Sequence, residues 1–333
     1  MPVEPLIFSL SGNTTYGLPL KDGGVLLVDA GPDVPDEGTW DLALQQLAVH
    51  GLRAADVRVV LLTHWHLDHS GLAWRWVAEG AQIFVGEDDL NAVASGQAWN
   101  ERLFKVRVRT LIEHGCPDRL AGNFAQPTRR RPPEYRWEPC PREALSAIRD
   151  GAEFVLEDGA ALRVVSAPGH TLGNLVAFVE ASGDLYSGDT LLPSTVPTPG
   201  LHFPASADVG GSSFSEGRWP SLPSFIRSVG QLRRLNVQRV LPGHGGVVEG
   251  QDVERLFVRF ERHHARRSAK VRQLLEEKSD TAYGLVFRLF PHLPELRLAQ
   301  AMTEVIGQLD VLVASGDIIA EREGEAWVHR IFD

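Results

Sequence analysis

Cysteines and long apolar runs are scarce in this chain of 333 residues. Its two cysteines, Cys116 and Cys140, fit a reducing compartment, and we expect free thiols rather than a disulfide or metal ligands. No apolar run reaches the ~18 residues that a membrane span needs. The start Met1-Pro2-Val3-Glu4 lacks the basic residues of a signal peptide. These absences predict a cytoplasmic location and no membrane partner.

Positive charge is also in deficit. The chain has 33 Lys and Arg against 43 Asp and Glu, a net charge of -10, which argues against a general nucleic-acid binder. The hydrophobic content of 43% is that of a globular protein with a sizeable core. A chain of this length is long for one domain and comfortable for two.

The densest group of metal-type ligands is the stretch Thr63-His64-Trp65-His66-Leu67-Asp68-His69-Ser70-Gly71, which follows the apolar run Val57 to Leu62. In an extended segment residues i and i+2 point the same way, so His64 and His66 can grip one cation together. A helix is expected to begin near Ser70-Gly71, and the turn would swing Asp68 and His69 toward a second position. The spacing therefore predicts two metal ions ~3.5–4 Å apart, if further ligands arrive from elsewhere.

Three later residues stand in the right kind of place, each on a tight glycine-containing loop after a short apolar strand. They are His170 in Pro168-Gly169-His170, Asp189 in Gly188-Asp189-Thr190 and His244 in Pro242-Gly243-His244. Glycines let the backbone bend there, so that the side chain faces a shared cleft. Each alone is a weak signal; together and in this order they are strong.

With these motifs the sequence resembles metallo-β-lactamase-fold hydrolases, from about residue 5 to about residue 250. The resemblance implies an α/β fold, a four-layer αββα sandwich. It also implies that His64, His66 and His170 hold the first metal, that Asp68, His69 and His244 hold the second, and that Asp189 bridges both. All seven positions are filled in this chain.

The ligand set indicates metal-assisted hydrolysis. A water shared by two divalent cations has its pKa lowered toward neutrality, which supplies a nucleophile without a catalytic Ser or Cys. Asp68 is the candidate catalytic residue, because it could orient that water and pass a proton to the leaving group. Imidazole and carboxylate ligands suit zinc best, and manganese or iron is allowed by the same donors.

The order of expected elements fits two mixed sheets packed face to face with helices outside. Strands are expected near residues 6–10, 14–18, 25–29, 57–62, 154–156, 162–165, 175–179 and 240–241, and helices near 39–50 and 222–235. The turn Asp29-Ala30-Gly31-Pro32 resembles an Asp-x-Gly turn of the family, and we interpret it as structural support near the site.

Two insertions depart from a minimal member of the family. The first, residues 88–149, is helical around residues 90–94 and 98–114 and is placed to overhang the cleft. Trp99, Tyr135 and Trp137 are weak candidates for substrate contacts in an apolar lid; they could equally pack the insertion onto the body, or contribute to a homodimer. Arg129-Arg130-Arg131 fits a solvated loop better than an anion site. The second insertion, Pro193 to Gly217, is expected to form an opposite wall.

Residues 251–333 form a predicted C-terminal domain with helices near 252–278, 281–290 and 298–315 and a hairpin near 318–331. This order resembles a winged helix, a small α+β domain found in the β-lactamase-like protein 2 branch of the family. The stretch has 12 Lys or Arg and 14 Asp or Glu. A basic cluster lies on its first helix, at Arg259, Arg262, Arg266, Arg267, Lys270 and Arg272. The supposed recognition helix at 298–315 is apolar, so packing against the catalytic body or a partner subunit is favoured over nucleic-acid binding. We expect His263-His264 to be a surface or interface pair rather than a metal site.

The sequence thus predicts a binuclear metal hydrolase acting on a small ester-like substrate, a thioester or lactone. A weak likeness to hydroxyacylglutathione hydrolases supports the thioester. A phosphodiesterase or ribonuclease would use the same two metals, and an iron-dependent redox enzyme would use the same fold. Non-enzymatic regulation through a DNA-binding winged helix is the remaining alternative.

Overall fold

The computed structural model describes residues 3–124, 134–203 and 218–332. The chain divides into two compact units, each assembled from three stretches of sequence. The first contains residues 1–99, 131–197 and 228–257, and the second contains residues 100–130, 198–227 and 258–333. Throughout the described ranges, no helix is both long and apolar enough to cross a membrane.

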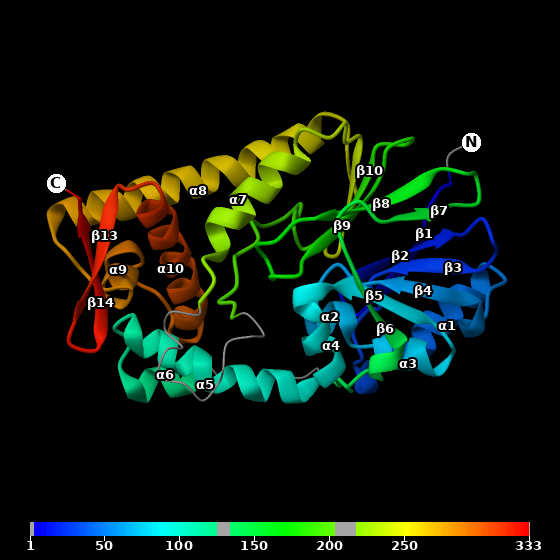
Figure 1. The fold of residues 1–333 in the computed structure, drawn as a ribbon, viewed down its shortest axis with the longest axis horizontal. Coiled ribbons are helices and arrows are strands. Elements are labelled where there is room, and N and C mark those ends of the chain that lie inside the picture. Colours follow the sequence, from blue (N-terminus) through cyan, green and yellow to red (C-terminus); the bar gives the residue numbers. More distant parts are fainter. Residues whose placement is uncertain (1–2, 125–133, 204–217, 333) are drawn as a thin grey trace. The chain divides into compact units, whose positions relative to one another are not determined.

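The first sheet is six-stranded, with its strands in sequence order (Figure 1). They are β1 (Leu6–Leu10), β2 (Asn13–Pro19), β3 (Val25–Val28), β4 (Val57–Leu61), β5 (Gln82–Gly86) and β6 (Leu145–Ile148). β1 to β3 pair antiparallel, and β3 to β6 pair parallel. Parallel neighbours need a crossover connection, which α1 (Thr39–Val49) provides between β3 and β4 and α2 (Leu67–Ser70) with α3 (Ala73–Ala78) provide between β4 and β5.

The second sheet is also six-stranded, in the order β12-β11-β10-β9-β8-β7. Only β10 and β11 pair parallel, and the other pairs are antiparallel. The bounds are β7 (Glu153–Val155), β8 (Ala161–Ser166), β9 (Leu175–Val179), β10 (Asp184–Gly188), β11 (Arg239–Pro242) and β12 (Val248–Glu249).

The main core of the first unit lies between these two sheets. Buried apolar side chains from both sheets form one cluster, which includes Leu26 and Leu61 of the first sheet and Leu162 and Ala177 of the second. The rings of Tyr16 and Tyr186 pack edge to face within the cluster, with their centres 5.4 Å apart. Outside the first sheet, α1 contacts β1 and α3 contacts β4 and β5. The predicted α/β sandwich is therefore confirmed.

The second unit contains most of the remaining helices and the hairpin. Its elements are parts of α5 (Gln97–Glu113), α7 (Ser221–Leu232) and α8 (Gln251–Glu277), with α6 (Asp118–Phe124), α9 (Ala282–Leu289), α10 (Leu298–Ala314), β13 (Ile318–Glu323) and β14 (Ala326–Ile331). Thr281 caps α9, because its hydroxyl accepts the Gly284 N–H at 3.1 Å. The predicted order of three helices and a hairpin is present, and its likeness to a winged helix stays a prediction.

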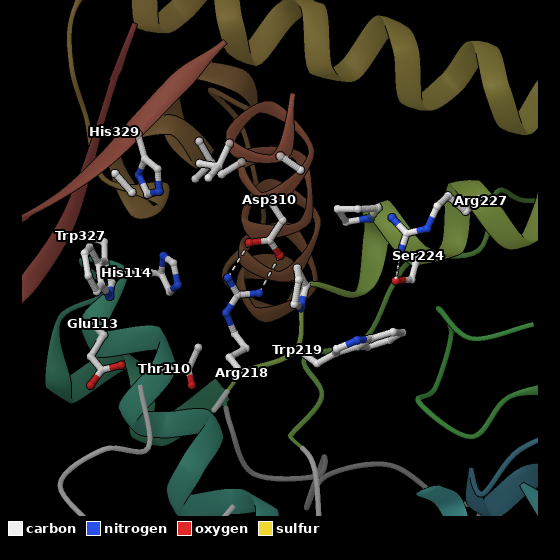
Figure 2. Close-up of a pocket in the computed structure, with 16 residues that line it drawn as sticks. Thr110, Glu113, His114, Arg218, Trp219, Ser224, Arg227, Asp310, Trp327 and His329 are labelled. Atoms are coloured by element: carbon white, nitrogen blue, oxygen red, sulfur yellow. Dashed lines mark hydrogen bonds and ion pairs between the residues drawn. The ribbon is translucent and has the colours of Figure 1, made fainter. Parts of the chain in front are cut away.

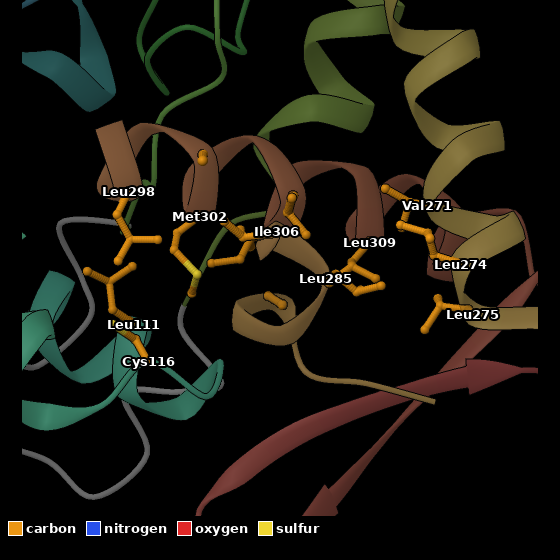
Figure 3. Packing of buried hydrophobic residues seen from close by; sticks show 14 of the residues in the cluster. Leu111, Cys116, Val271, Leu274, Leu275, Leu285, Leu298, Met302, Ile306 and Leu309 are labelled. Carbon is orange, nitrogen blue, oxygen red and sulfur yellow. The ribbon is translucent and has the colours of Figure 1, made fainter. Parts of the chain in front are cut away.

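Helix α10 is the centre of the second unit's core. Its apolar residues Met302, Ile306 and Leu309 pack with Leu285 of α9 and Val271 of α8 (Figure 3). Burial of such side chains stabilises the unit by roughly 1.5–3 kcal/mol each. The buried apolar residues of this helix thus pack within its own unit, whereas the sequence favoured packing against the catalytic body or a partner subunit.

Several charged and polar side chains of the second unit have ion-pair or hydrogen-bond partners that the sequence alone did not reveal. Arg267 pairs with Glu304 at 2.7 Å, and Arg272 pairs with Glu276 at 2.6 Å, so part of the basic cluster is neutralised. The prediction for His263-His264 was wrong for His264, which is buried, with its Nδ1 3.1 Å from Gln308 Nε2. A buried polar group needs such a partner.

Two strands of the first sheet, β5 and β6, have no counterpart among the expected strands. Residues 82–86 follow α3 directly, and residues 145–148 lie inside the stretch that the sequence assigns to the helical insertion. Both are short, and β6 pairs with β5 across about sixty residues of chain. A strand of four residues has too little periodicity to be recognised alone.

Candidate metal centre

The densest ligand motif lies where β4 ends. His64 and His66 lie in the extended segment after the strand, and Asp68 and His69 lie on α2. His64 and His69 are buried, whereas the side chain of Asp68 is 31% exposed. The strand before the motif is as expected, but the prediction that a helix begins near Ser70-Gly71 was wrong. Helix α2 begins at Leu67 and ends at Ser70, so Asp68 and His69 lie on this helical turn and not before it.

The other three residues follow strands of the second sheet. His170 lies between β8 and β9, Asp189 directly follows β10, and His244 follows β11. Glycine is required in the last loop, because a Cβ at Gly243 would lie 2.5 Å from Cε1 of His69. Only glycine at this position lets the loop approach the first motif so closely.

All seven side chains meet in one place. Three overlapping groups each bring their ligand atoms within 4.8 Å of one another and could hold a metal ion. These groups are His64 with His66 and His170, His64 with His69 and Asp189, and Asp68 with His69 and His244. The first and third groups are the two triads that the family resemblance implies, and their role as metal ligands stays a prediction.

Asp189 lies between the two triads. Its Oδ2 is 3.7 Å from Nε2 of His170, and its Oδ1 is 3.4 Å from Nε2 of His69 and 3.6 Å from Nε2 of His244. Each carboxylate oxygen thus faces imidazoles of a different triad. This arrangement suits the bridging position proposed for it.

The donor set fits divalent cations. Nε2 of His64 is buried and has no hydrogen-bond partner among the described residues, although a buried polar atom is costly to leave unsatisfied. Nε2 of His170 and Nδ1 of His66 face each other at 3.0 Å. Imidazole nitrogens and carboxylate oxygens that converge in this way satisfy zinc, and manganese or iron as well.

Electrostatics in the centre are set by burial and by opposed charges. Burial, and then the neighbouring imidazoles, hold the pKa of His64 well below its usual range. Burial alone would lower the pKa of His69, but Asp29, Asp189 and Asp68 outweigh it and hold that pKa well above its usual value. Burial would raise the pKa of Asp189, yet the positive charge of the surrounding imidazoles lowers it. The carboxylate is therefore ionised, as a metal ligand must be.

Asp29 holds the candidate metal centre in place through hydrogen bonds to His69 and Thr63. Its Oδ2 accepts from Nδ1 of His69 at 2.8 Å, and its Oδ1 accepts from the Thr63 N–H at 2.7 Å. Its φ of 67° lies in the left-handed region that few residues other than glycine adopt. The expected supporting role of this turn is confirmed. Holding Nδ1 in this way leaves Nε2 of His69 to face the predicted second metal.

Replacing Asp29 by Asn should weaken metal binding about 10- to 100-fold, the usual cost of losing a hydrogen bond that orients a ligand. The Asn amide has a single oxygen, and its NH2 group cannot accept a hydrogen bond, so either His69 or Thr63 loses its partner. Metal affinity, measured by competition with a chromophoric chelator, checks this. Asp33→Asn is the matched control: Asp33 is equally buried but accepts from Trp74 and Arg75, so an equal loss there would contradict the specific role.

Sequence reasoning missed two supports of the site. Buried Asp89 accepts from the Trp65 N–H at 3.2 Å, the Thr171 hydroxyl at 2.5 Å and the Gly173 N–H at 2.9 Å, and so ties two ligand loops together. Burial raises its pKa to about 7 against these hydrogen bonds. The carbonyl of Gly12 accepts from Nδ1 of His244 at 2.8 Å. A Gly-Asn turn between two strands could have indicated the second, but nothing local marks Asp89.

The three aromatic residues that the sequence offers as substrate contacts differ in burial. Trp99 and Trp137 are buried, and Trp137 stacks on Trp65 with ring centres 5.6 Å apart, so both pack the fold. Tyr135 is 38% exposed, and burial and the charge of Asp68 raise its pKa. Of the three candidates, only Tyr135 has an exposed side chain. Arg129, Arg130 and Arg131 lie outside the described residues, as do residues 204–217 of the second insertion.

Both cysteines are free, as expected, and the structure shows that both are buried. Burial raises the pKa of Cys140 to about 12, and burial with the charge of Asp118 raises that of Cys116 to about 11. Neither thiol belongs to the groups of candidate ligands among the described residues.

Comparison with known proteins places the motif in a family context. Residues 12–244, more than half of the chain, match the family described as the metallo-beta-lactamase superfamily. A solved metallo-beta-lactamase family protein from Thermus thermophilus is similar in fold, with a TM-score of 0.73 and 24% identity over 99% of this chain and 98% of that one.

Curated relatives have more specific names. A probable metallo-hydrolase from Bacillus subtilis is 31% identical over 92% of this chain and 89% of its own length. A beta-lactamase-like protein 2 homolog from Drosophila melanogaster is 27% identical over 74% of this chain and 63% of its own. An atrochrysone carboxyl ACP thioesterase from Aspergillus fumigatus is 25% identical over 83% of this chain and 64% of its own. The match thus spans under two thirds of the last two relatives.

Proposed function

Because this chain belongs to the metallo-beta-lactamase superfamily, we propose that it is a hydrolase in which seven side chains hold two divalent metal ions. The observation that carries the proposal is the convergence of those seven side chains into overlapping groups that could hold metal. We further propose zinc as the metal and a thioester as the substrate class, with a lactone as the close alternative. The name of the Aspergillus relative supports the thioester.

The proposed reaction divides its tasks among the residues of the centre. When bound, two divalent cations would lower the pKa of a shared water toward neutrality and polarise the oxygen of the attacked carbonyl. Asp189 would fix the spacing of the two triads, because one of its oxygens faces each of them.

Asp68 is the residue placed to move a proton. Its Oδ2 lies 3.1 Å from Nε2 of His244, and its side chain is partly exposed, so solvent or a leaving group can reach it. Burial would raise the pKa of Asp68, but the charge of His69 and the hydrogen bond from His244 lower it, so the carboxylate is ionised near neutral pH. An ionised carboxylate can accept the proton of the attacking water and then return it to the departing thiolate.

Tyr135 is the proposed contact to the substrate. The neighbouring backbone is anchored, since the N–H of Arg136 donates to the carbonyl of Asp33 at 2.8 Å. The partly exposed phenol can donate a hydrogen bond to a substrate carbonyl near Asp68. A homodimer and the C-terminal winged-helix role stay predictions.

The test is a substrate panel of acyl thioesters, lactones, phosphodiesters and single-stranded RNA, run on wild-type protein and on Asp189→Asn. We expect thioester hydrolysis to exceed hydrolysis of the phosphodiester and RNA by at least about 100-fold in kcat/KM, a transition-state difference of about 2.7 kcal/mol. RNA cleavage that vanishes in the variant and survives repurification would favour the ribonuclease. Iron in freshly purified protein without hydrolysis would favour a redox enzyme. Wild-type protein that hydrolyses none of these substrates but binds DNA specifically would favour a regulatory role.

A further inference from the structure

The second unit contains a cavity of about 480 Å³ that the metal centre does not explain. It is lined by the end of α5, the segment that leads into α7, the first part of α7 itself, one face of α10 and the hairpin (Figure 2). All of its lining residues belong to the second unit, and none of them is one of the seven candidate ligands. Cavities of this size typically hold a small organic molecule.

Two buried imidazoles form one wall. His114, just after α5, and His329, on β14, are 6% and 3% exposed, and their rings lie nearly parallel at 9° with centres 6.2 Å apart. In both residues Nδ1 is buried and has no hydrogen-bond partner in the part of the chain that the structure describes. Buried polar atoms are rarely left so, which points to a polar group that is supplied from outside the chain.

These imidazoles are neutral at physiological pH. Burial lowers the pKa of His329 to about 4, and burial with the charge of Arg218 holds that of His114 well below its usual range. A neutral ring carries one donor and one acceptor, and so can hydrogen-bond a hydroxyl or a carbonyl without adding charge.

One arginine of the lining, Arg227, is exposed and forms no ion pair with a carboxylate in the described part of the chain. Arg218 forms two hydrogen bonds of 2.6 Å with Asp310, and Glu113 pairs with Arg109 at 3.0 Å, so both acids are already compensated. Arg227 donates to the Ser224 hydroxyl at 2.6 Å and has no carboxylate partner among residues 3–124, 134–203 and 218–332. A guanidinium in a cavity wall recognises a carboxylate well.

Apart from Thr110, the rest of the lining is apolar. Trp219 and Trp327 contribute aromatic surface, while Pro220, Pro223, Leu309 and Val313 contribute aliphatic surface. In Figure 2, Arg227 and the two imidazoles lie on opposite sides of the Arg218–Asp310 pair, and Trp219 lies on the same side as Arg227. A ligand that satisfies both ends must carry an anionic group and a second polar group on an apolar body.

We propose that this cavity binds a small aromatic carboxylate that carries a hydroxyl or carbonyl at its other end. The carboxylate contacts Arg227 and Ser224, the ring lies against Trp219, and the distal polar group contacts His114 and His329. The proposal concerns a ligand site separate in its residues from the proposed hydrolase centre, and it does not depend on hydrolysis.

The experiment measures binding of 4-hydroxyphenylacetate and of its uncharged amide to the full-length protein by calorimetry and saturation-transfer NMR. Metal is first removed by a chelator, so that a carboxylate cannot report on the metal centre. We expect the acid to bind at least about 10-fold tighter than the amide, since a charge-assisted hydrogen bond is stronger than a neutral one. Arg227→Gln should remove this preference, whereas Arg227→Lys should retain part of it.

Two further variants distinguish binding in the cavity from unspecific binding elsewhere on the protein. His114→Phe keeps the ring and removes its nitrogens, so it should weaken acid and amide alike by several fold. Arg255→Gln, an exposed arginine paired with Asp252 on α8, should change nothing. Equal binding of acid and amide, no binding of either, or an acid preference that survives in folded Arg227→Gln protein would overturn the proposal.

Discussion

Asp189→Asn is expected to abolish turnover while the fold persists. The substitution keeps the size of the side chain but removes the negative charge from between the two triads, where each oxygen faces a different set of imidazoles. If stabilisation of several kcal/mol is lost from the transition state, the rate falls by about 10³-fold or more. Steady-state kinetics on the preferred substrate of the panel measure this loss, and circular dichroism confirms folding.

Asp158→Asn serves as the matched control for that variant. Asp158 is exposed and, among the residues that the structure describes, accepts only from the backbone N–H groups of Val3 and Ala160 in the same unit. Its loss should therefore leave kcat within about twofold. His170→Ala tests the same centre from another strand end and should be as inactive as Asp189→Asn. Undiminished turnover in either ligand variant, with metal content at the wild-type level, would refute the ligand assignment.

Removing metal from the wild-type protein is expected to stop turnover and to lower the melting temperature. A ligand that binds only the folded state stabilises it by about 2.7 kcal/mol when present at 100 times its dissociation constant. For a unit of 150–250 residues this corresponds to a shift of about 5–10 °C. Scanning calorimetry with and without a chelator measures the shift.

The chelator itself must be controlled for in that experiment. Chelator saturated beforehand with zinc should leave both the melting temperature and turnover unchanged, and re-addition of zinc should restore stripped protein. Stripped protein that melts at the original temperature and keeps full turnover would show that no metal supports either the fold or the reaction.

Much of the site was predictable because its chemistry is written in short local motifs. The stretch from His64 to His69 contains four ligand-type side chains within six residues. Gly243 precedes His244 because a side chain there would collide with His69. The strands before these loops are apolar enough to be recognised from their residues alone. The local motifs, together with the family resemblance, therefore predicted which seven side chains come together, while their role as metal ligands stays a prediction.

What the sequence could not show depends on distant pairings. Asp89 looks like one of several acids on a surface turn, and only the folded chain brings it beneath the loops of Trp65 and Thr171. His114 and His329 stack across most of the length of the second unit's sequence, and neither sits in a motif. Strand β6 is defined by its pairing with β5 rather than by its four residues. Tertiary context decides each of these features.

The central claim, that seven side chains hold two divalent ions, is tested most directly by the metal content of freshly purified protein. Elemental analysis should find about two divalent ions per chain in the wild type. It should find about one in His170→Ala and about one in His244→Ala, since each variant loses a ligand of only one triad. A fully active wild-type protein with one ion or none, or either variant retaining the full wild-type complement, would contradict the account.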